Sequence, residues 1–223
     1  MRFWGMVVFG VLGTTILLSL GIWQLQRLAW KHEVLRAIES KILAPAVEIP
    51  QTVLPDAHSL LPVRAEGRYK GDTVRVLVSQ KIYGAGYRLI TAFELVDGRT
   101  IMLDRGFTSV RLEMPSTPEG RGQVIGNLQW PQEIDSFTPE NDLAANIWFA
   151  RDVARLAEHL KAEPVLLVLR DSSFETEAAT PLPKMTANIP NDHMNYAITW
   201  FSLALIWLGM SGYFLYRSRD PQS

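Results

Sequence analysis

Residues 3–23 read FWGMVVFGVLGTTILLSLGIW, and residues 194–216 read MNYAITWFSLALIWLGMSGYFLY. Neither stretch contains a charged residue, and an α-helix of either length is roughly 30 Å or longer, which matches the hydrocarbon core of a bilayer. Aromatic residues gather at both ends of the second stretch, as they do in the interfacial belts of membrane proteins. The sequence therefore predicts two transmembrane helices, residues 3–26 and 191–216, that lie in a lipid bilayer.

Both predicted helices carry small residues that would let their backbones approach each other closely. These are Gly10 and Thr14 in the first helix and Ala197, Gly209 and Gly212 in the second. Lipid is as apolar as a leucine side chain, so close packing over small residues is an important source of helix association in membranes. We expect the two helices to pair and to present a composite surface to a membrane-bound partner.

The first apolar run has a second interpretation, a cleaved signal peptide. Ser19-Leu20-Gly21 offers a weak cleavage site. The uncharged run from Phe3 to Gln26 has 24 residues, whereas the apolar core of a signal peptide is about 7–15 residues long. The length favours a retained anchor.

Charges in the two tails predict the orientation. Arg2 precedes the first helix and Arg217 and Arg219 follow the second, and such charges favour the cytoplasmic side when the connecting segment is long. We expect both termini to be cytoplasmic and residues 27–187 to form an exported domain, which is periplasmic in a two-pass protein of a bacterial inner (cell) membrane. Arg27 and Lys31, just beyond the first helix, argue more weakly for the opposite orientation.

The segment between the helices reads as one α+β domain with a mainly antiparallel sheet and short helices. Asp97-Gly98 is its strongest hairpin signal, because an alternating stretch ends before it and another begins after it. Gly84-Ala85-Gly86 is interpreted as a turn between strands. We expect about five or six strands in the sheet. The predicted strands are residues 62–69, 74–78, 87–95, 100–107, 123–128 and 164–169, the predicted helices are 30–43 and 152–161, and residues 172–190 are a linker.

Composition and motifs exclude several classes of protein. With 22 basic and 23 acidic residues the formal charge is −1, so nucleic acid is not an expected partner. The chain has no cysteine, which excludes disulfides, thiolate metal sites and covalently attached haem. It also lacks the G-x-S-x-G, H-E-x-x-H and P-loop motifs, and Asp104-Arg105 is interpreted as a structural ion pair. We therefore do not expect an enzyme.

His193 is the histidine that stands out. It follows Pro190-Asn191-Asp192, which predicts a helix N-cap, so it belongs to the first turn of the second membrane helix. Tyr196, Trp200, Leu203 and Trp207 follow it at helical spacing. One interpretation is an interfacial histidine above a helix–helix contact. The other is an axial ligand of a flat macrocycle that lies against the aromatic side chains, since the helix N-terminus disfavours imidazolium and only neutral imidazole binds iron.

The first helix offers a matching outer end. Trp23, Arg27 and Trp30 fall on one helical face, and Lys31 lies one turn beyond Arg27. Either cation could pair with a carboxylate such as a haem propionate. Simple anchoring by tryptophan and snorkelling arginine is the other interpretation.

Three stretches also carry a resemblance. Residues 21–31 read GIWQLQRLAWK, residues 86–107 contain Gly-Tyr, Asp-Gly and LDRGF in turn, and residues 191–201 read NDHMNYAITWF. Together with two terminal helices around a large domain, these stretches resemble the surfeit locus (Surf-one) family over nearly the whole chain. The family's histidine maps onto His193, its tyrosine onto Tyr196 and its Trp-Phe pair onto Trp200-Phe201.

The resemblance implies a function. Family members assist the biogenesis of haem–copper terminal oxidases, so it implies an assembly factor of the cytochrome c oxidase type that binds haem a and assists its insertion into subunit I, with subunit I and the haem a synthase as partners. His193 would be the metal ligand, and the other cofactor-binding residues would be Tyr196, Trp200, Trp23, Arg27 and Lys31.

Alternatives stay open beside this interpretation. One is a cofactor-free structural chaperone that stabilises an assembly intermediate, and a weaker one is copper delivery through Met185, His193 and Met194. Two departures from the family pattern, Phe107 for the usual tryptophan and Asp192 for the usual asparagine, leave open whether the client is a cytochrome c oxidase or a quinol oxidase.

Overall fold

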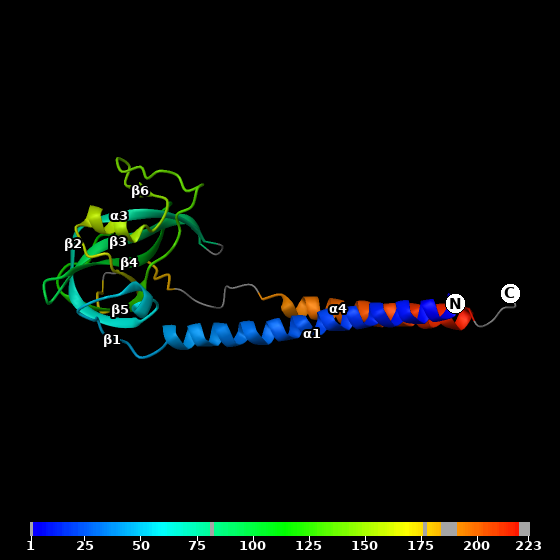
Figure 1. Cartoon of the computed structure of the whole chain (residues 1–223). Coiled ribbons are helices and arrows are strands. Elements are labelled where there is room, and N and C mark those ends of the chain that lie inside the picture. The colour runs from blue at the N-terminus through cyan, green and yellow to red at the C-terminus, as the bar shows by residue number, and fades with distance from the viewer. Residues whose placement is uncertain (1, 81–82, 176–177, 184–190, 219–223) are drawn as a thin grey trace. The chain divides into compact units, whose positions relative to one another are not determined.

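The computed structural model of the chain describes residues 2–80, 83–175, 178–183 and 191–218. The chain divides into two compact units (Figure 1). One, here called the helix pair, consists of Met1–Glu39 and Thr186–Ser223, and the other, the β domain, consists of Ser40–Met185.

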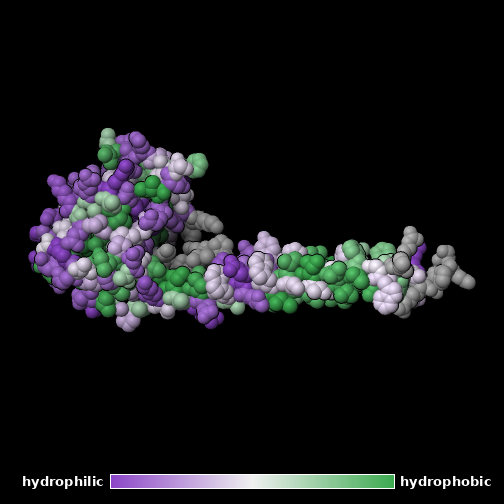
Figure 2. Space-filling view, in the orientation of Figure 1, coloured by the Kyte–Doolittle hydropathy of each residue, from purple (hydrophilic) through white to green (hydrophobic). Residues whose placement is uncertain are grey.

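The helix pair is built from α1 (Arg2–Ile42) and α4 (His193–Arg217). By length and composition both helices are able to cross a membrane. Figure 2 shows hydrophobic side chains over much of the outer surface of this unit, whereas hydrophilic side chains prevail over the visible face of the β domain. The predicted helix 30–43 is the continuation of α1, which ends at Ile42, and the last residues of α1 belong to the β domain.

Helices α1 and α4 run antiparallel, with aromatic rings of α4 seated over glycines of α1. A Cβ atom added at Gly21 would come within 2.7 Å of the Phe201 ring, and one added at Gly13 would collide with Trp207. The predicted pairing over small residues is confirmed for Gly10 and Ala197, which are buried. The prediction is wrong for Gly209 and Gly212 of α4. A Cβ at either position would meet nothing within 4 Å, so these glycines do not contact α1.

Five strands of the β domain form a closed sheet. The order is β2, β3, β4, β7, β5, and β5 then pairs with β2 again. Two short strands add to β2 as parallel partners, and β4 pairs with β7 in parallel as well. The strands are β1 (Val47–Glu48), β2 (Pro62–Gln80), β3 (Gly84–Leu95), β4 (Thr100–Ser109), β5 (Gly122–Gln129), β6 (Ile147–Trp148) and β7 (Leu166–Ser172), and the short helices are α2 (Pro55–His58) and α3 (Val153–Leu160).

Two hydrophobic clusters hold this sheet together. The larger includes Phe93, Leu103 and Leu128, all fully buried. The second includes Leu156 of α3 and Trp148 of β6, so α3 packs against the sheet. Helix α3 begins where Asp152 accepts hydrogen bonds from two backbone N–H groups, and it ends at Lys161 in the left-handed conformation.

Each of the six predicted strand segments overlaps a strand, and the predicted hairpin joins β3 and β4 around Gly98, whose φ is +89°. Predicted strands 62–69 and 74–78 are one strand, since β2 continues through a bulge between Lys70 and Thr73. The prediction of a turn at residues 84–86 is wrong, because Gly84 begins β3 and Gly86 pairs with Ser109 of β4. Strands β1 and β6 and helix α2 were not predicted. Within the predicted linker, Thr180 pairs with Phe107, and residues 184–190 lie outside the described part.

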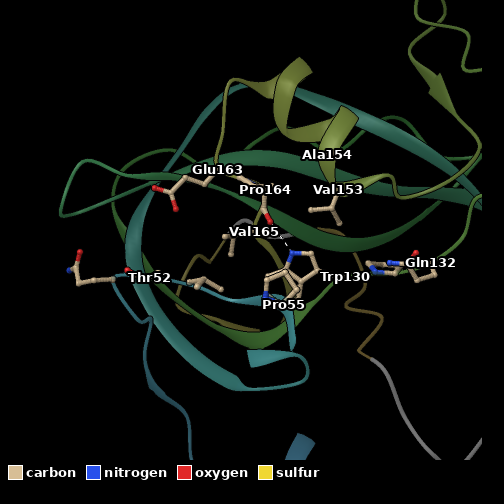
Figure 3. A pocket seen from close by; sticks show the side chains of 12 residues that line it. Thr52, Pro55, Trp130, Gln132, Val153, Ala154, Glu163, Pro164 and Val165 are labelled. Carbon is tan, nitrogen blue, oxygen red and sulfur yellow. Dashed lines mark hydrogen bonds between the residues drawn. The ribbon is translucent and has the colours of Figure 1, made fainter. Parts of the chain in front are cut away.

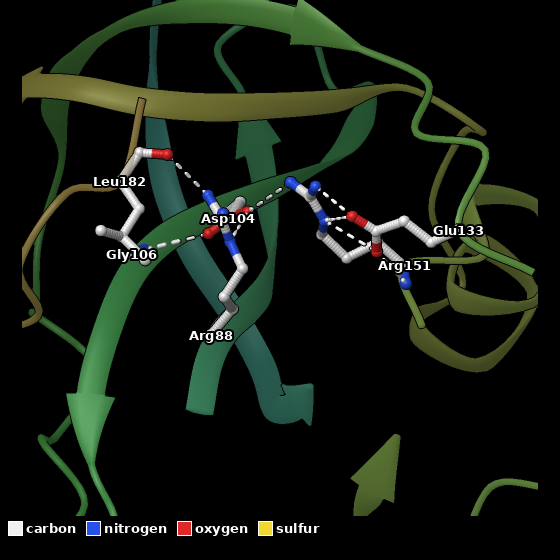
Figure 4. A network of polar contacts seen from close by, with 6 residues as sticks. All are labelled: Arg88, Asp104, Gly106, Glu133, Arg151 and Leu182. Atoms are coloured by element: carbon white, nitrogen blue, oxygen red, sulfur yellow. Dashed lines mark hydrogen bonds and ion pairs between the residues drawn. The ribbon is translucent and has the colours of Figure 1, made fainter. Parts of the chain in front are cut away.

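Asp104 is fully buried, and its ion pairs differ from the predicted one with Arg105. Arg88 donates through Nε to Asp104 at 2.7 Å, and Arg151 lies 3.5 Å away on the other side (Figure 4). Arg105 instead lies over the ring of Tyr69 and donates to the carbonyl of Ser116. The prediction failed because neighbouring residues in a strand point to opposite faces of the sheet.

Candidate functional site

His193 is the first residue of α4 and contacts α1 through its side chain. Its Nδ1 lies 2.8 Å from Oε1 of Gln24, so a hydrogen bond joins two residues that are 169 positions apart. His193 is half-buried. Asp192 occupies the N-cap position, as predicted, but its side chain makes no capping hydrogen bond.

Gln24 is the site residue that sequence reasoning missed. Its side chain is turned into the contact between the helices, and the residue is only 8% exposed. A signal for it was available, because an amide inside an apolar membrane run is costly unless it finds a hydrogen-bond partner. Gln26 lies in the same uncharged run but is exposed. The presence of an amide in the run therefore does not by itself distinguish Gln24 from Gln26.

The hydrogen bond indicates which ring nitrogen of His193 carries the proton. An amide oxygen only accepts, so the partner nitrogen Nδ1 must donate, and the neutral ring then keeps a lone pair on Nε2. Histidine ligands of metals commonly show this pattern, with one nitrogen donating to an oxygen and the other left for the metal. The donor chemistry at His193 therefore fits an axial ligand.

The other predicted residues of the second helix differ in exposure. Trp200 is half-buried beside Ala197, which is buried against α1, whereas Tyr196 is 57% exposed. On a regular helix the predicted aromatic stripe spans about 80° of the surface, and along it Trp200 and Trp207 are half-buried whereas Tyr196 and Leu203 are exposed.

On α1, the guanidinium of Arg27 lies over the ring of Trp30 at 4.5 Å from its centre. Trp23 is half exposed and Lys31 is half-buried. In the described part of the chain, the hydrogen bond of His193 goes to Gln24 and to none of the five other predicted residues. The structure thus brings together Arg27 and Trp30, and separately His193 and Gln24.

The β domain offers a pocket of another kind. A cavity of 580 Å³ is lined mainly by apolar side chains, among them Trp130, Pro55 and Val153 (Figure 3). Trp130 donates through Nε1 to the carbonyl of Pro164 at 2.9 Å. Among the described residues no three His, Cys, Asp or Glu side chains are placed to hold a metal ion. The polar side chains of the cavity lining are Gln51, Thr52, Gln132 and Glu163.

The buried charges around Asp104 form a network that ties loops to the sheet. Arg88 donates to the carbonyl of Leu182 at 2.8 Å, and Arg151 binds Glu133 through two nitrogens (Figure 4). Burial alone would raise the pKa of Glu133, but the hydrogen bonds and charge of Arg151 outweigh it and hold that pKa below 4.5. Burial likewise opposes the charge of Arg151, whose pKa is nevertheless raised by Glu133 and Asp104. Opposite charges here compensate each other, so we assign the network a structural role.

The profile of the SURF1 family matches residues 11–205 of this chain. The chain belongs to the SURF1 family. A SURF1-like protein of Rickettsia prowazekii is 30% identical over 94% of this chain and 88% of its own length. One from Rickettsia felis is 27% identical over 86% of this chain and 88% of its own. Surfeit locus protein 1 of Homo sapiens is 29% identical over 83% of this chain and 69% of its own. The SURF1 match spans both helices and the β domain, so it includes both Gln24 and His193.

Proposed function

We propose that this protein is an assembly factor for a haem–copper terminal oxidase of the cytochrome c oxidase type, and that its helix pair holds haem a for insertion into subunit I. Membership of the SURF1 family supports a role in oxidase assembly. The resemblance of the motifs around Gln24 and His193 to those of family members supports the extension to haem a.

One observation carries the haem proposal: Nδ1 of His193 lies 2.8 Å from Oε1 of Gln24, so this hydrogen bond leaves Nε2 unused. The iron of a bound haem takes an imidazole nitrogen as axial ligand. Nε2 of His193 is the nitrogen that remains for it. The position of His193 in the first turn of α4 also favours negative charge nearby, and haem carries two propionates.

The residues around His193 supply the rest of the proposed site. Trp200, Tyr196 and Trp23 offer ring faces and edges against which a flat apolar macrocycle packs. Arg27 and Lys31 carry the cations that would pair with the propionates. Arg27 already lies against Trp30, which limits the freedom of its side chain and lowers the cost of ordering it.

The same proposal includes location and partners. Two helices able to span a membrane support residence in a bilayer, and we propose a bacterial inner membrane with both termini cytoplasmic and the β domain periplasmic. Oxidase subunit I and the haem a synthase are the proposed partners, because both are membrane proteins that handle haem a. The protein acts by holding its cofactor and its partners, and we do not propose an enzyme.

A second candidate is a structural chaperone that binds no cofactor. The observation that favours it is the same hydrogen bond, since the His193–Gln24 pair already satisfies two polar groups between the helices without any ligand. Copper delivery is a third: Met194 is exposed next to His193, and Met185 lies outside the described residues.

Absorbance separates these candidates. The full-length protein is purified in detergent, supplied with haem a and compared with His193→Ala and with His32→Ala, a control that removes an exposed histidine from α1. We expect a Soret band in the wild type and in the control, and its loss in His193→Ala at unchanged protein level. A full Soret band in His193→Ala would refute the ligand assignment, and copper by elemental analysis would favour the third candidate.

A further inference from the structure

The contact that joins α1 to α4 at His193 is made by the uncharged amide of Gln24. Gln24 and His193 lie within the same compact unit, and their side chains meet at 2.8 Å. Gln24 is 8% exposed, so water competes little for its amide. A hydrogen bond between membrane helices is strong enough to bias the orientation of one ring.

We infer that Gln24 is a positioning residue that fixes the tautomer and the orientation of His193. This inference rests on the proposed haem function for its purpose, but its structural content stands without the cofactor. With Oε1 of Gln24 as acceptor, the proton resides on Nδ1 and the lone pair on Nε2 points away from Gln24, because the two ring nitrogens lie on opposite sides of the imidazole.

The alternative tautomer is disfavoured by the same contact. A proton on Nε2 would leave the Nδ1 lone pair facing the lone pairs of the Gln24 oxygen at hydrogen-bond distance. If the Gln24 amide were rotated, its N–H would donate to Nδ1 and the Nε2–H tautomer would be the bonded one. The tautomer of His193 therefore has to be measured. A neutral histidine side chain in water favours the Nε2–H tautomer modestly, and Gln24 is therefore expected to reverse an intrinsic preference.

The contact also links cofactor affinity to helix pairing. Gln24 is on the same buried face of α1 as Gly21, which receives the ring of Phe201. Any change that shifts α1 against α4 at this level moves the acceptor of the His193 proton. Hydrogen-bond partners of metal-binding histidines typically change metal affinity by roughly 10–100-fold when they are removed. We expect Gln24→Leu to weaken haem a binding by about tenfold or more.

The first test needs no haem. The full-length protein is labelled with ¹⁵N-histidine in detergent micelles, and the resonances of His193 are assigned by their loss in His193→Ala. We expect Nδ1 of wild-type His193 to be protonated and Nε2 to be unprotonated at neutral pH. In Gln24→Leu the two shifts should move towards the Nε2–H tautomer, while Gln26→Leu, an exposed position two residues away, should leave them unchanged. A wild-type His193 protonated on Nε2 would overturn the inference even if Gln24→Leu failed to fold.

The second test adds haem a to the same variants. Gln24→Leu should lower affinity and shift the Soret band, Gln26→Leu should match the wild type, and Gln24→Glu should retain binding because it keeps an acceptor oxygen. A carboxylate makes the imidazole more basic, so Gln24→Glu should also lower the reduction potential of the bound haem. Unchanged affinity, band position and potential in Gln24→Leu would refute the positioning role while the proposed function stood. Absence of haem binding by the wild type would instead refute the haem function, and the ¹⁵N shifts would still decide the role of Gln24.

Discussion

Trp207 of α4 donates its indole N–H to the carbonyl oxygen of Gly10 on α1 at 3.1 Å. The indole reaches this carbonyl because Gly13 has no side chain, and a Cβ atom at Gly13 would collide with the ring. The ring of Phe9 packs against the same indole with the centroids 5.1 Å apart. Trp207 therefore joins the two helices both by packing and by a hydrogen bond.

Gly13→Leu should separate the helices. A leucine side chain would occupy the volume of the Trp207 ring, and overpacking of this kind costs about 1–3 kcal/mol. Since the chain has no cysteine, Gly10→Cys with Ser211→Cys gives a clean readout. A Cβ at Gly10 lies 3.0 Å from that of Ser211, which is closer than the roughly 3.8 Å of a disulfide, so the bond needs a displacement of about 1 Å.

The double-cysteine protein should crosslink readily, and Gly13→Leu should lower the yield. Gly209→Leu is the matched control, because a Cβ at Gly209 meets nothing within 4 Å. Equal yields in the two leucine variants would show that the indole does not hold the helices together.

The difference between Gly13 and Gly209 also shows how far the sequence alone reaches. The lengths of the two uncharged runs predicted both membrane helices, and the Asp97-Gly98 dipeptide predicted the hairpin. Each of these signals lies within a short stretch of sequence. Which glycine faces the partner helix depends on how the helices are rotated, and no local pattern fixes that rotation. The sequence therefore identified Ala197 of α4 correctly, but it also named Gly209 and Gly212, which do not face α1.

Long-range pairing limited the other predictions in the same way. Closure of the sheet needs β5 to reach β2, where Val63 faces Gly126, and Asp104 takes its partners from β3 and from the loop before α3. His193 was found because it follows a helix-start signal. Gln24 was not, since its partner lies 169 positions away.

Asp104→Asn should destabilise the β domain strongly. It would leave Arg88 and Arg151 beside a neutral side chain with their charges largely buried, and breaking a buried pair typically costs about 3–5 kcal/mol. Thermal unfolding of the full-length protein in detergent measures the change. Glu48→Gln removes an exposed pair with Arg64 and should cost less than about 1 kcal/mol. Similar shifts for both variants would mean that Asp104 makes no special contribution.

Acid should weaken the contact between Glu133 and Arg151. The pKa of Glu133 is lowered from 4.5 in the folded chain, where the bonds and charge of Arg151 outweigh the opposing effect of burial. A carboxylate with a depressed folded-state pKa stabilises the fold above its unfolded value, and this stabilisation is lost as the pH falls through the folded-state pKa. Glu133→Gln should thus be less stable than the wild type at pH 7, and the gap should narrow once the pH falls below about 4.5. A gap that stays constant from pH 7 to pH 3 would contradict the assignment.

The orientation of the chain is the last prediction, and it depends on a few charges. Arg217 ends α4, and together with Arg2 it places positive charge at the tail side of both helices, whereas Arg27 and Lys31 lie at the opposite ends of the apolar runs. Because a long exported segment contributes little to orientation, reporter fusions after Gly120 and after Ser223 in a bacterial host should report opposite compartments, with Gly120 outside. Replacing Arg217 and Arg219 by glutamine should increase the share of inverted molecules, while the same change at Arg27 and Lys31 should decrease it. If both fusions report one compartment, the two-pass topology fails, and the proposed site at the outer ends of α1 and α4 fails with it.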